Sequence, residues 1–195
     1  MKNVSHETLD QLKEFQEQVL RWNQRINLIG RTTTSAIAER HIQDSLQLYA
    51  LAPSAARWCD MGSGAGFPGL VVAICAKQTP TEFILIEADR RKAAFLSHIS
   101  RMFDLNTRVI AERIERVDKL NADVVSARAL APLGMLLDYG HRHAKPDATF
   151  LFPKGASYRA ELDAVRDDWR FSVEPIQSKT SDDSVILKIK DLARA

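Results

Sequence analysis

A glycine-rich stretch at residues 60–70, Asp-Met-Gly-Ser-Gly-Ala-Gly-Phe-Pro-Gly-Leu, carries the densest chemical signal in this sequence. Glycine is needed where the backbone takes a positive φ or lies against a ligand with no Cβ between them. An apolar piece precedes the stretch, and a continuous apolar run, residues 70–76, follows it. The pattern predicts a strand, a glycine turn and a buried helix, whose first N–H groups face a ligand on the loop.

Two classes of cofactor fit this loop. The spacing Gly64-x-Gly66-x-x-Gly69 matches the dinucleotide fingerprint of NAD oxidoreductases. Asp60 followed by Gly62, Gly64 and Gly66 matches the acidic loop of S-adenosylmethionine (AdoMet) methyltransferases. We favour AdoMet because Asp60 would repel a doubly anionic pyrophosphate, whereas a carboxylate suits the ammonium and sulfonium of the methionine end. NAD binding without AdoMet binding would reverse this choice.

An acidic residue ends the next predicted strand. Residues 81–86 form an apolar run of strand length, and Glu87 follows them 21 residues after Gly66. In doubly wound sheets, an acid at the tip of the second strand accepts hydrogen bonds from ribose hydroxyls. A solvated glutamate is the alternative, but the spacing from the glycine loop favours ribose binding.

Side chains at the tips of three further strands face the same crevice, because ligands of open α/β sheets bind outside the carboxyl ends of the strands. Ile114 and Glu115 follow the third strand, where an adenine would meet an apolar and a polar neighbour; an ordinary exposed loop fits the spacing equally well. Arg128 follows the fourth strand and can address a carboxylate, a phosphate or a base. Lys154 ends the fifth strand.

The elements that position these groups alternate along the chain. Helices are predicted over residues 5–29, 35–51, 89–103, 133–143 and 157–168, besides the helix after the glycine loop. Strands are predicted over residues 55–59, 81–87, 108–111, 122–126, 148–152, 171–175 and 185–189. The order indicates an α/β, Rossmann-like fold with a mostly parallel seven-stranded sheet and a terminal antiparallel hairpin. We expect residues 1–53 to form an N-terminal helical extension packed on the core, and residues 54–195 to form one methyltransferase domain.

The bulk composition is that of an ordinary globular chain of 195 residues, 45% apolar and 27% charged. A net charge of only +2 means that any nucleic-acid contact must come from local patches. Cys59 and Cys75 lack metal-ligand spacing and suit buried thiols in a reducing compartment. The N-terminus is polar and every apolar run is too short to cross a bilayer. We therefore expect a cytoplasmic protein with no metal, no membrane contact and a monomeric state.

One local basic patch lies near the N-terminus. Arg21, Arg25, Arg31 and Arg40 accompany Trp22, with Glu39 the one acid between residues 21 and 41. A nucleic-acid contact with an aromatic in it is one interpretation, and a solvated basic face is the other, which charge alone favours. In the helix that follows, His41 and Asp44 share one face and either contact RNA or pair with each other.

Taken together, these residues resemble the GidB/RsmG family, bacterial methyltransferases that use AdoMet to modify a guanine N7 in 16S ribosomal RNA. The resemblance covers nearly the whole chain. Its marks are Trp22-Asn23 with Asn27-Leu28, Arg40-His41-Ile42-x-Asp44-Ser45, Gly-Phe-Pro-Gly at residues 66–69, Arg113-Ile114-Glu115, Ser126-Ala127-Arg128-Ala129 and Lys154-Gly155. Two departures stand out: many members read Ser-Arg-Ala where this chain reads Ser-Ala-Arg-Ala, and Glu87 stands where an aspartate is more usual.

The resemblance implies a role for each position. The expected cofactor contacts are Asp60, Gly62, Gly64, Gly66, Phe67, Glu87, Ile114, Glu115 and Arg128. Arg128 would also position the guanine. The expected RNA contacts are Arg21, Arg25, Arg31, Arg40, His41 and Lys154, with 16S rRNA or a small-subunit assembly intermediate as the partner.

The chemistry implied is an in-line displacement with no obligatory general base, because guanine N7 has a free lone pair and catalysis can come from positioning. Two alternatives keep the same fold: an AdoMet enzyme acting on a small molecule or a protein, and a non-catalytic RNA-binding module. The basic N-terminal patch argues against the first, and the intact glycine loop with Glu87 argues against the second.

Overall fold

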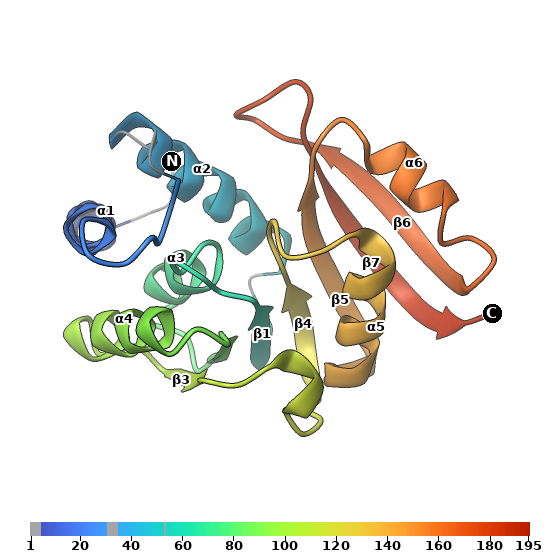
Figure 1. Ribbon diagram of the computed structural model, residues 1–195, viewed down its shortest axis with the longest axis horizontal. Helices are drawn as coiled ribbons and strands as arrows, with labels where there is room; N and C mark the ends of the chain where they lie inside the picture. Colours follow the sequence, from blue (N-terminus) through green and yellow to red (C-terminus); the bar gives the residue numbers. More distant parts are fainter. Residues whose placement is uncertain (1–4, 31–34, 53) are drawn as a thin grey trace.

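A seven-stranded sheet forms the centre of the computed structural model, which describes residues 5–30, 35–52 and 54–195, without the side chains of residues 35–38 (Figure 1). The strands are β1 Arg57–Met61, β2 Glu82–Ile86, β3 Thr107–Ile110, β4 Ala122–Ser126, β5 Ala144–Lys154, β6 Trp169–Gln177 and β7 Val185–Arg194. Their order is β3-β2-β1-β4-β5-β7-β6. β1 to β5 are parallel, and β7 runs antiparallel to both β5 and β6. The predicted Rossmann-like sheet with its terminal hairpin is confirmed.

The chain order of this sheet reverses at β1, which pairs with β2 on one side and with β4 on the other. Ligands of open α/β sheets bind at such a switch point, outside the carboxyl ends of the strands. The glycine loop leaves the carboxyl end of β1, and the segment holding Arg128 leaves the carboxyl end of β4. The topology therefore brings the two predicted site segments together.

Helices cover both faces of the sheet. They are α1 His6–Asn23, α2 Ser35–Leu51, α3 Gly69–Cys75, α4 Arg90–Met102, α5 Leu133–His143 and α6 Tyr158–Asp163, with a short 3₁₀ turn, η1, at Ile114–Arg116. Alternate residues of β1 point to opposite faces. Cys59 and Met61 pack in the core beside α5, whereas Trp58 packs with α3 and with Leu48 of α2. The apolar run of α3 is buried throughout because it lies between the sheet and the N-terminal helices.

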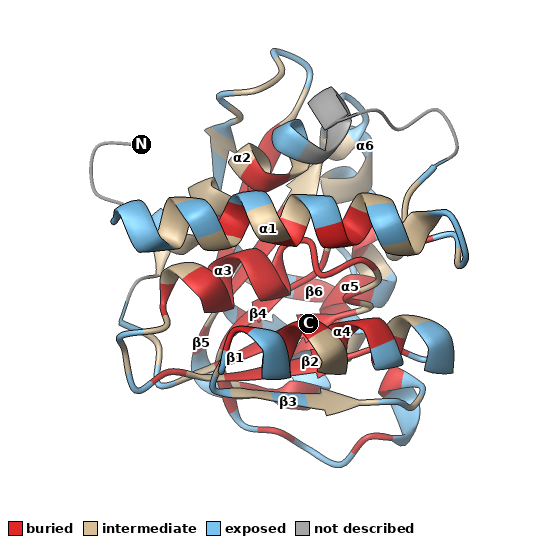
Figure 2. Cartoon of the chain, turned by 90° about the vertical axis from the view of Figure 1, so that its left-hand side faces the viewer, coloured by how far each residue is buried: buried red, intermediate tan, exposed pale blue. Residues whose placement is uncertain are grey.

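The helices α1 and α2 lie on the outside of α3, and the buried residues of α1 face α3 (Figure 2). The Phe15 ring is fully buried and packs edge-on against Phe67 of the glycine loop, with ring centroids 5.3 Å apart. It also stacks on Phe95 of α4 at 6.4 Å. The N-terminal helices thus share a core with the loop. The predicted division at residue 53 remains a prediction.

The first helix ends earlier than its apolar pattern predicts, at Asn23 instead of residue 29. The Asn23 side-chain oxygen accepts the backbone N–H groups of Leu28 at 2.8 Å and Ile29 at 2.9 Å. These bonds fold the chain back on itself after α1. As a result, Leu28 and Ile29 are held against the glycine loop.

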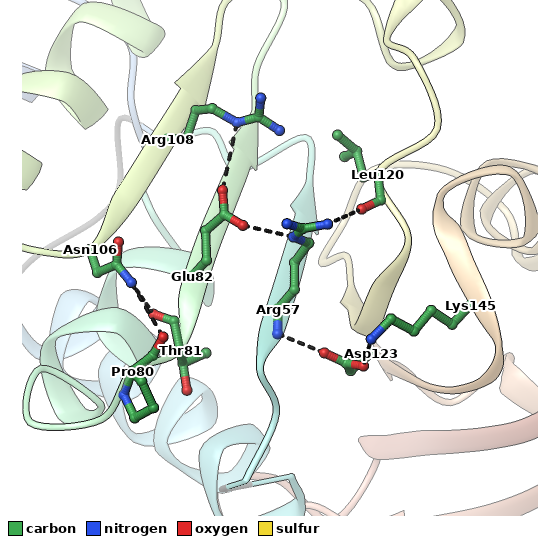
Figure 3. Close-up of polar contacts among 9 residues, drawn as sticks. All are labelled: Arg57, Pro80, Thr81, Glu82, Asn106, Arg108, Leu120, Asp123 and Lys145. Atoms are coloured by element: carbon green, nitrogen blue, oxygen red, sulfur yellow. Dashed lines mark hydrogen bonds and ion pairs between the residues drawn. The ribbon is translucent and has the colours of Figure 1, made fainter.

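A polar network ties the strands together at their amino ends, opposite the crevice (Figure 3). The Arg57 guanidinium donates to Glu82 at 2.7 Å and to the Leu120 carbonyl at 2.8 Å, and the Arg57 backbone N–H donates to Asp123 at 2.7 Å. Asp123 also pairs with Lys145. The network joins β1, β2 and β4 to β5, and none of its residues lies at the carboxyl edge.

Candidate active site at the carboxyl edge of the sheet

The glycine loop takes the left-handed backbone conformations that its residue types predict. Gly62, Gly64 and Gly66 have φ values of 66°, 53° and 89°. The positive φ of Gly62 disfavours other residues, and a Cβ there would lie 2.6 Å from the Leu130 side chain, which would have to shift. At Gly64, a Cβ would meet only the Gly62 carbonyl oxygen, at 3.8 Å, because that residue faces open space.

Asp60 supports this loop from beneath. Its carboxylate is fully buried, accepts the Gly69 N–H at 3.2 Å and accepts the Ser126 hydroxyl at 2.7 Å. Ser126 in turn accepts the Trp58 indole N–H at 2.9 Å. Burial raises the pKa of Asp60 to about 6, against the lowering effect of these hydrogen bonds.

This placement corrects one part of the sequence argument. Asp60 was expected to face the cationic end of a cofactor directly. Its carboxylate instead accepts hydrogen bonds from Gly69 at the start of α3 and from Ser126 of β4. Gly66 is likewise buried, packed against Leu70. Both residues shape the loop, and neither lines the cavity that the loop bounds.

That cavity, the central cavity, has a volume of about 450 Å³ and opens between the tips of the strands. Seven of the predicted site residues line it: Gly62, Gly64, Phe67, Glu87, Ile114, Glu115 and Arg128. The sequence did not single out Ile29, Lys92, Leu130 and Tyr139, which also line it. Most of these residues follow the tips of four parallel strands, and the others come from the turn after α1 and from the helices α4 and α5, so only the fold gathers them.

Glu87 crosses from the tip of β2 to the glycine loop. One carboxylate oxygen accepts the Gly64 N–H at 2.8 Å, and the other accepts the Asp89 N–H at 2.8 Å. The side chain is nearly buried, at 9% exposure, yet lines the central cavity. Each oxygen keeps a further lone pair, so the carboxylate can accept a hydroxyl while it holds the loop.

The opposite wall of the central cavity combines an apolar residue with a second carboxylate. Ile114 is buried at the start of η1, and its carbonyl meets His143 Nε2 at 3.1 Å. Glu115 accepts the Tyr139 hydroxyl at 2.7 Å. Hydrogen bonds from its own backbone and from Tyr139 hold the pKa of Glu115 below its ordinary value, so this wall carries a fixed negative charge.

Arg128 is held by contacts from two elements. Its Nη1 atom lies 2.9 Å from His41 Nδ1 and 3.8 Å from the Asp44 carboxylate, both on α2. Its guanidinium also lies over the Phe67 ring, 5.2 Å from the centroid, a distance at which a cation is attracted to an aromatic face. Asp44 further accepts the Thr180 hydroxyl from the β6–β7 connection.

The charge state of His41 follows from this contact. Burial, reinforced by the nearby Arg128 cation, lowers the pKa of His41 to about 4. At neutral pH the imidazole is therefore uncharged, and its Nδ1 lone pair accepts a hydrogen bond from Arg128. His41 and Asp44 both hold Arg128, through a hydrogen bond and an ion pair respectively. The RNA contact predicted for His41 remains a prediction.

A smaller side cavity of about 290 Å³ adjoins the central one, and Arg128 and Ala129 line both. Its other walls include Asp44 and Gln47 of α2, and Lys154 at the end of β5. Lys154 donates to Glu161 at 2.7 Å and to the Ala131 carbonyl at 3.1 Å. With its ammonium bound internally and a side chain only 10% exposed, Lys154 is poorly placed for the RNA contact that the sequence predicted.

The remaining predicted RNA contacts are scattered. Arg21 and Arg25 are exposed at the end of α1, and Arg40 is exposed on α2. Arg31 lies outside the described residues. These arginines stand apart from the central cavity, whose lining includes none of those that the structure describes.

Two negative findings apply to the part of the chain that the structure describes. No group of three or more His, Cys, Asp and Glu residues there is arranged to hold a metal ion. None of its helices is both long and apolar enough to cross a membrane.

Sequence comparison places the chain among known proteins. The family model GidB, described as "rRNA small subunit methyltransferase G", matches residues 8–186. The chain is similar to the ribosomal RNA small subunit methyltransferase G of Ruegeria pomeroyi, with 45% identity over 98% of this chain and 95% of the relative. The protein of the same description from Gluconobacter oxydans is 41% identical over 100% of this chain and 99% of the relative.

Structural comparison supports the fold at much lower identity. The structure described as M. jannaschii TYW2 in complex with AdoMet superposes with a TM-score of 0.62 and 15% identity, over 80% of this chain and 77% of that chain. A SAM-dependent methyltransferase from Aquifex aeolicus gives a TM-score of 0.61 with 12% identity, over 78% and 92%. These likenesses establish the architecture alone.

Proposed function

The chain belongs to the GidB family of rRNA small subunit methyltransferases, and from this membership we propose that it transfers the methyl group of AdoMet to N7 of a guanine in 16S ribosomal RNA. The observation that carries the proposal is the central cavity, where seven residues predicted to bind the cofactor meet around one glycine loop. This function makes the chain an AdoMet-dependent methyltransferase.

The residues present fit AdoMet. A volume of about 450 Å³ lies within the range of small-molecule sites. The Glu87 carboxylate suits the ribose hydroxyls, and Ile114 with Glu115 suits the adenine. The backbone at Gly64 leaves open space for close approach of a ligand. When bound, AdoMet supplies a methyl group activated by its sulfonium.

The guanine is best accommodated on the other side of Arg128. The side cavity adjoins the central cavity across Arg128 and Ala129, and its volume of about 290 Å³ is the smaller of the two. Arg128 lines both cavities, and α2 holds its guanidinium there through His41 and Asp44. We therefore assign the side cavity to the acceptor base and the central cavity to the cofactor.

The protein's own contribution to this reaction is positioning. Guanine N7 carries a free lone pair, so no side chain has to remove a proton before the attack. The neutral His41 leaves the guanidinium of Arg128 as the cation at the boundary, where a bidentate donor can orient the base. Phe67 closes the boundary from the loop side. Holding two reactants in line in this way supplies much of the rate enhancement without an added base.

The proposal also covers the compartment, the form of the RNA substrate and the oligomeric state. We place the activity in the cytoplasm, on naked 16S rRNA or on a small-subunit assembly intermediate, by a monomer. The exposed arginines at the end of α1 support an RNA partner. Methylation of naked rRNA, isolated intermediates and mature subunits under one set of conditions distinguishes the substrates.

Calorimetric titration with AdoMet, and separately with NAD, tests the cofactor assignment. We expect AdoMet binding that weakens sharply in Glu87→Ala and is unchanged in Glu174→Ala, an exposed control on β6. Transfer of labelled methyl to undermethylated 16S rRNA then tests the reaction. Binding of NAD alone would refute the proposed cofactor, and methylation of a small molecule or a protein in place of rRNA would refute the substrate.

A further inference from the structure

A large hollow lies outside the active site. It is a groove of about 750 Å³ between α1 and α4, two helices that both face the viewer in Figure 2. Residues from Gln18 to Ile26 form one wall, and His98, Arg101 and Met102 form the other. None of these residues lines the central or the side cavity, so the proposed methyl transfer does not account for the groove.

The groove is basic, and its arginine side chains have no partner among the described residues. Arg21 and Arg25 reach it from α1 and the turn after it, and Arg101 reaches it from α4. All three are exposed. Across the described ranges 5–30, 35–52 and 54–195, no ion-pair or hydrogen-bond partner is found for any of the three guanidinium groups. No carboxylate is among the residues that line the groove.

An aromatic pair forms part of the same surface. The rings of Trp22 and His98 lie 5.4 Å apart, tilted by 36°. Trp22 is anchored from behind by Phe95, with centroids 5.4 Å apart. Both rings are half-buried, and Met102 beside them is 44% exposed. Half-buried rings flanked by arginines are the combination that single-stranded nucleic acids bind, with bases on the rings and phosphates on the cations.

The groove is connected to the active site by a short, fixed segment. Ile26 lines the groove, whereas Leu28 and Ile29 line the central cavity. The Asn23 side chain pins this turn by accepting the N–H groups of Leu28 and Ile29. Only one residue lies between Ile26 and Leu28 in the sequence, and an extended chain spans about 3.3 Å per residue. The two sites therefore lie close together along the backbone.

We propose that this α1–α4 groove binds a single-stranded segment of the RNA substrate, away from the nucleotide that is methylated. Arg21, Arg25 and Arg101 hold phosphates, and one base lies against the Trp22 and His98 rings. The inference rests on the proposed function for the identity of the RNA, but the groove itself is defined by its charge and its rings. The groove gives the enzyme a second contact with the RNA. It positions the target guanine only indirectly, through the RNA strand that connects the two sites.

The test is the affinity of a fluorescent single-stranded RNA oligonucleotide, measured by anisotropy over a range of salt concentrations. The variant R21Q/R25Q/R101Q removes three cations from the groove. The control R166Q/R170Q/K190Q removes three exposed cations from the far side, around β6 and β7. Because each single-strand phosphate contact contributes about 0.7 to the slope of log K against log salt, we expect the groove variant to lose about 2 from that slope and the control to lose nothing.

Two further variants keep the proposal testable if the triple variant does not fold. If R21Q/R25Q/R101Q fails to fold, Arg25→Gln alone is measured, with an expected loss of about 0.7 in slope. His98→Ala removes one ring while leaving Trp22 packed on Phe95, and we expect it to weaken RNA binding by about tenfold, within the range for one stacked base.

Enzyme kinetics separate this proposal from the proposed function. The groove variant should raise KM for rRNA while kcat and AdoMet affinity stay at wild-type values. A wild-type slope in the groove variant, an equal loss in the control, or displacement of the RNA by a polyglutamate peptide at lower concentration would each overturn the groove assignment. Wild-type protein that binds RNA through the groove but methylates no rRNA would refute the proposed function alone.

Discussion

The carboxylate beneath the glycine loop provides a pH-dependent test of the structure. Asp60 is fully buried, and its ionised form is stabilised by the Ser126 hydroxyl and the Gly69 N–H. These bonds do not offset the loss of hydration, so burial raises its pKa from 3.8 to about 6. The substitution Asp60→Asn keeps the shape of the side chain and removes the titration.

The direction of the effect follows from proton linkage. Since the folded pKa lies above the unfolded value, the native state binds the proton more tightly. The resulting contribution to stability is fully present below about pH 3.8 and is lost as the pH rises through about 6. A shift of about two pKa units corresponds to about 3 kcal/mol. Relative to Asp60→Asn, the wild type should therefore lose about 3 kcal/mol of unfolding free energy between about pH 4 and pH 7.

Urea unfolding of both proteins, extrapolated to water at several pH values, measures this difference. The asparagine loses one hydrogen bond. The two oxygens of Asp60 accept from Ser126 and Gly69 separately, whereas an amide has only one acceptor oxygen. That change adds a constant offset, so the slope with pH is the diagnostic quantity. Asp10→Asn, on the exposed side of α1, serves as the control. A difference between wild type and Asp60→Asn that stays flat from pH 4 to pH 7 would refute the reasoning.

Three further substitutions, one of them with a matched control, probe separate parts of the molecule. Arg128→Lys should keep the fold but lose most methyl transfer, measured as kcat on rRNA, because an ammonium does not replace a bidentate guanidinium; full activity would remove Arg128 from the site. Gly62→Ala should lower the unfolding free energy by about 1–2 kcal/mol and weaken AdoMet binding in calorimetry, because φ is 66° and the new Cβ would lie 2.6 Å from Leu130. Gly155→Ala, with no atom near its Cβ, should change neither quantity. Phe15→Ala should cost about 3–5 kcal/mol in urea unfolding, because a fully buried ring is removed from the core shared by α1 and the glycine loop; a cost below about 1 kcal/mol would contradict that packing.

Periodicity and turn chemistry predicted most of the fold because local and tertiary preferences agree. The predicted helix 133–143 and strand 122–126 match α5 and β4 residue for residue. α1 was predicted too long because its apolar spacing continues to Ile26, whereas the Asn23 side chain ends the helix through bonds five and six residues ahead. β5 was predicted too short because its flanks are polar, and pairing extends it at both ends: Ala144 pairs with β4, and Pro153 and Lys154 pair with β7.

The site was predictable where the residue type itself indicates the backbone conformation, as at the glycines. It was less predictable where side chains from elements far apart in the sequence come together. Ala129 takes a φ of 52° that alanine does not signal. Tyr139 reaches the central cavity from α5, and its bond to Glu115 spans 24 residues. Asp60 matched the expected pattern, yet its burial depends on the packing of α3 over β1, which the motif alone does not encode.

Because the Arg128 guanidinium borders both the central and the side cavity, we expect the two ligands proposed for these cavities to be coupled thermodynamically. Any shift of Arg128 that accompanies the filling of one cavity changes the free energy of filling the other, and linkage requires the factor to be the same in both directions. His41 and Asp44 limit how far the guanidinium can move, and so they set the size of that factor. The contacts of α2 therefore bear on the order in which substrates bind and products leave, as well as on the position of one side chain.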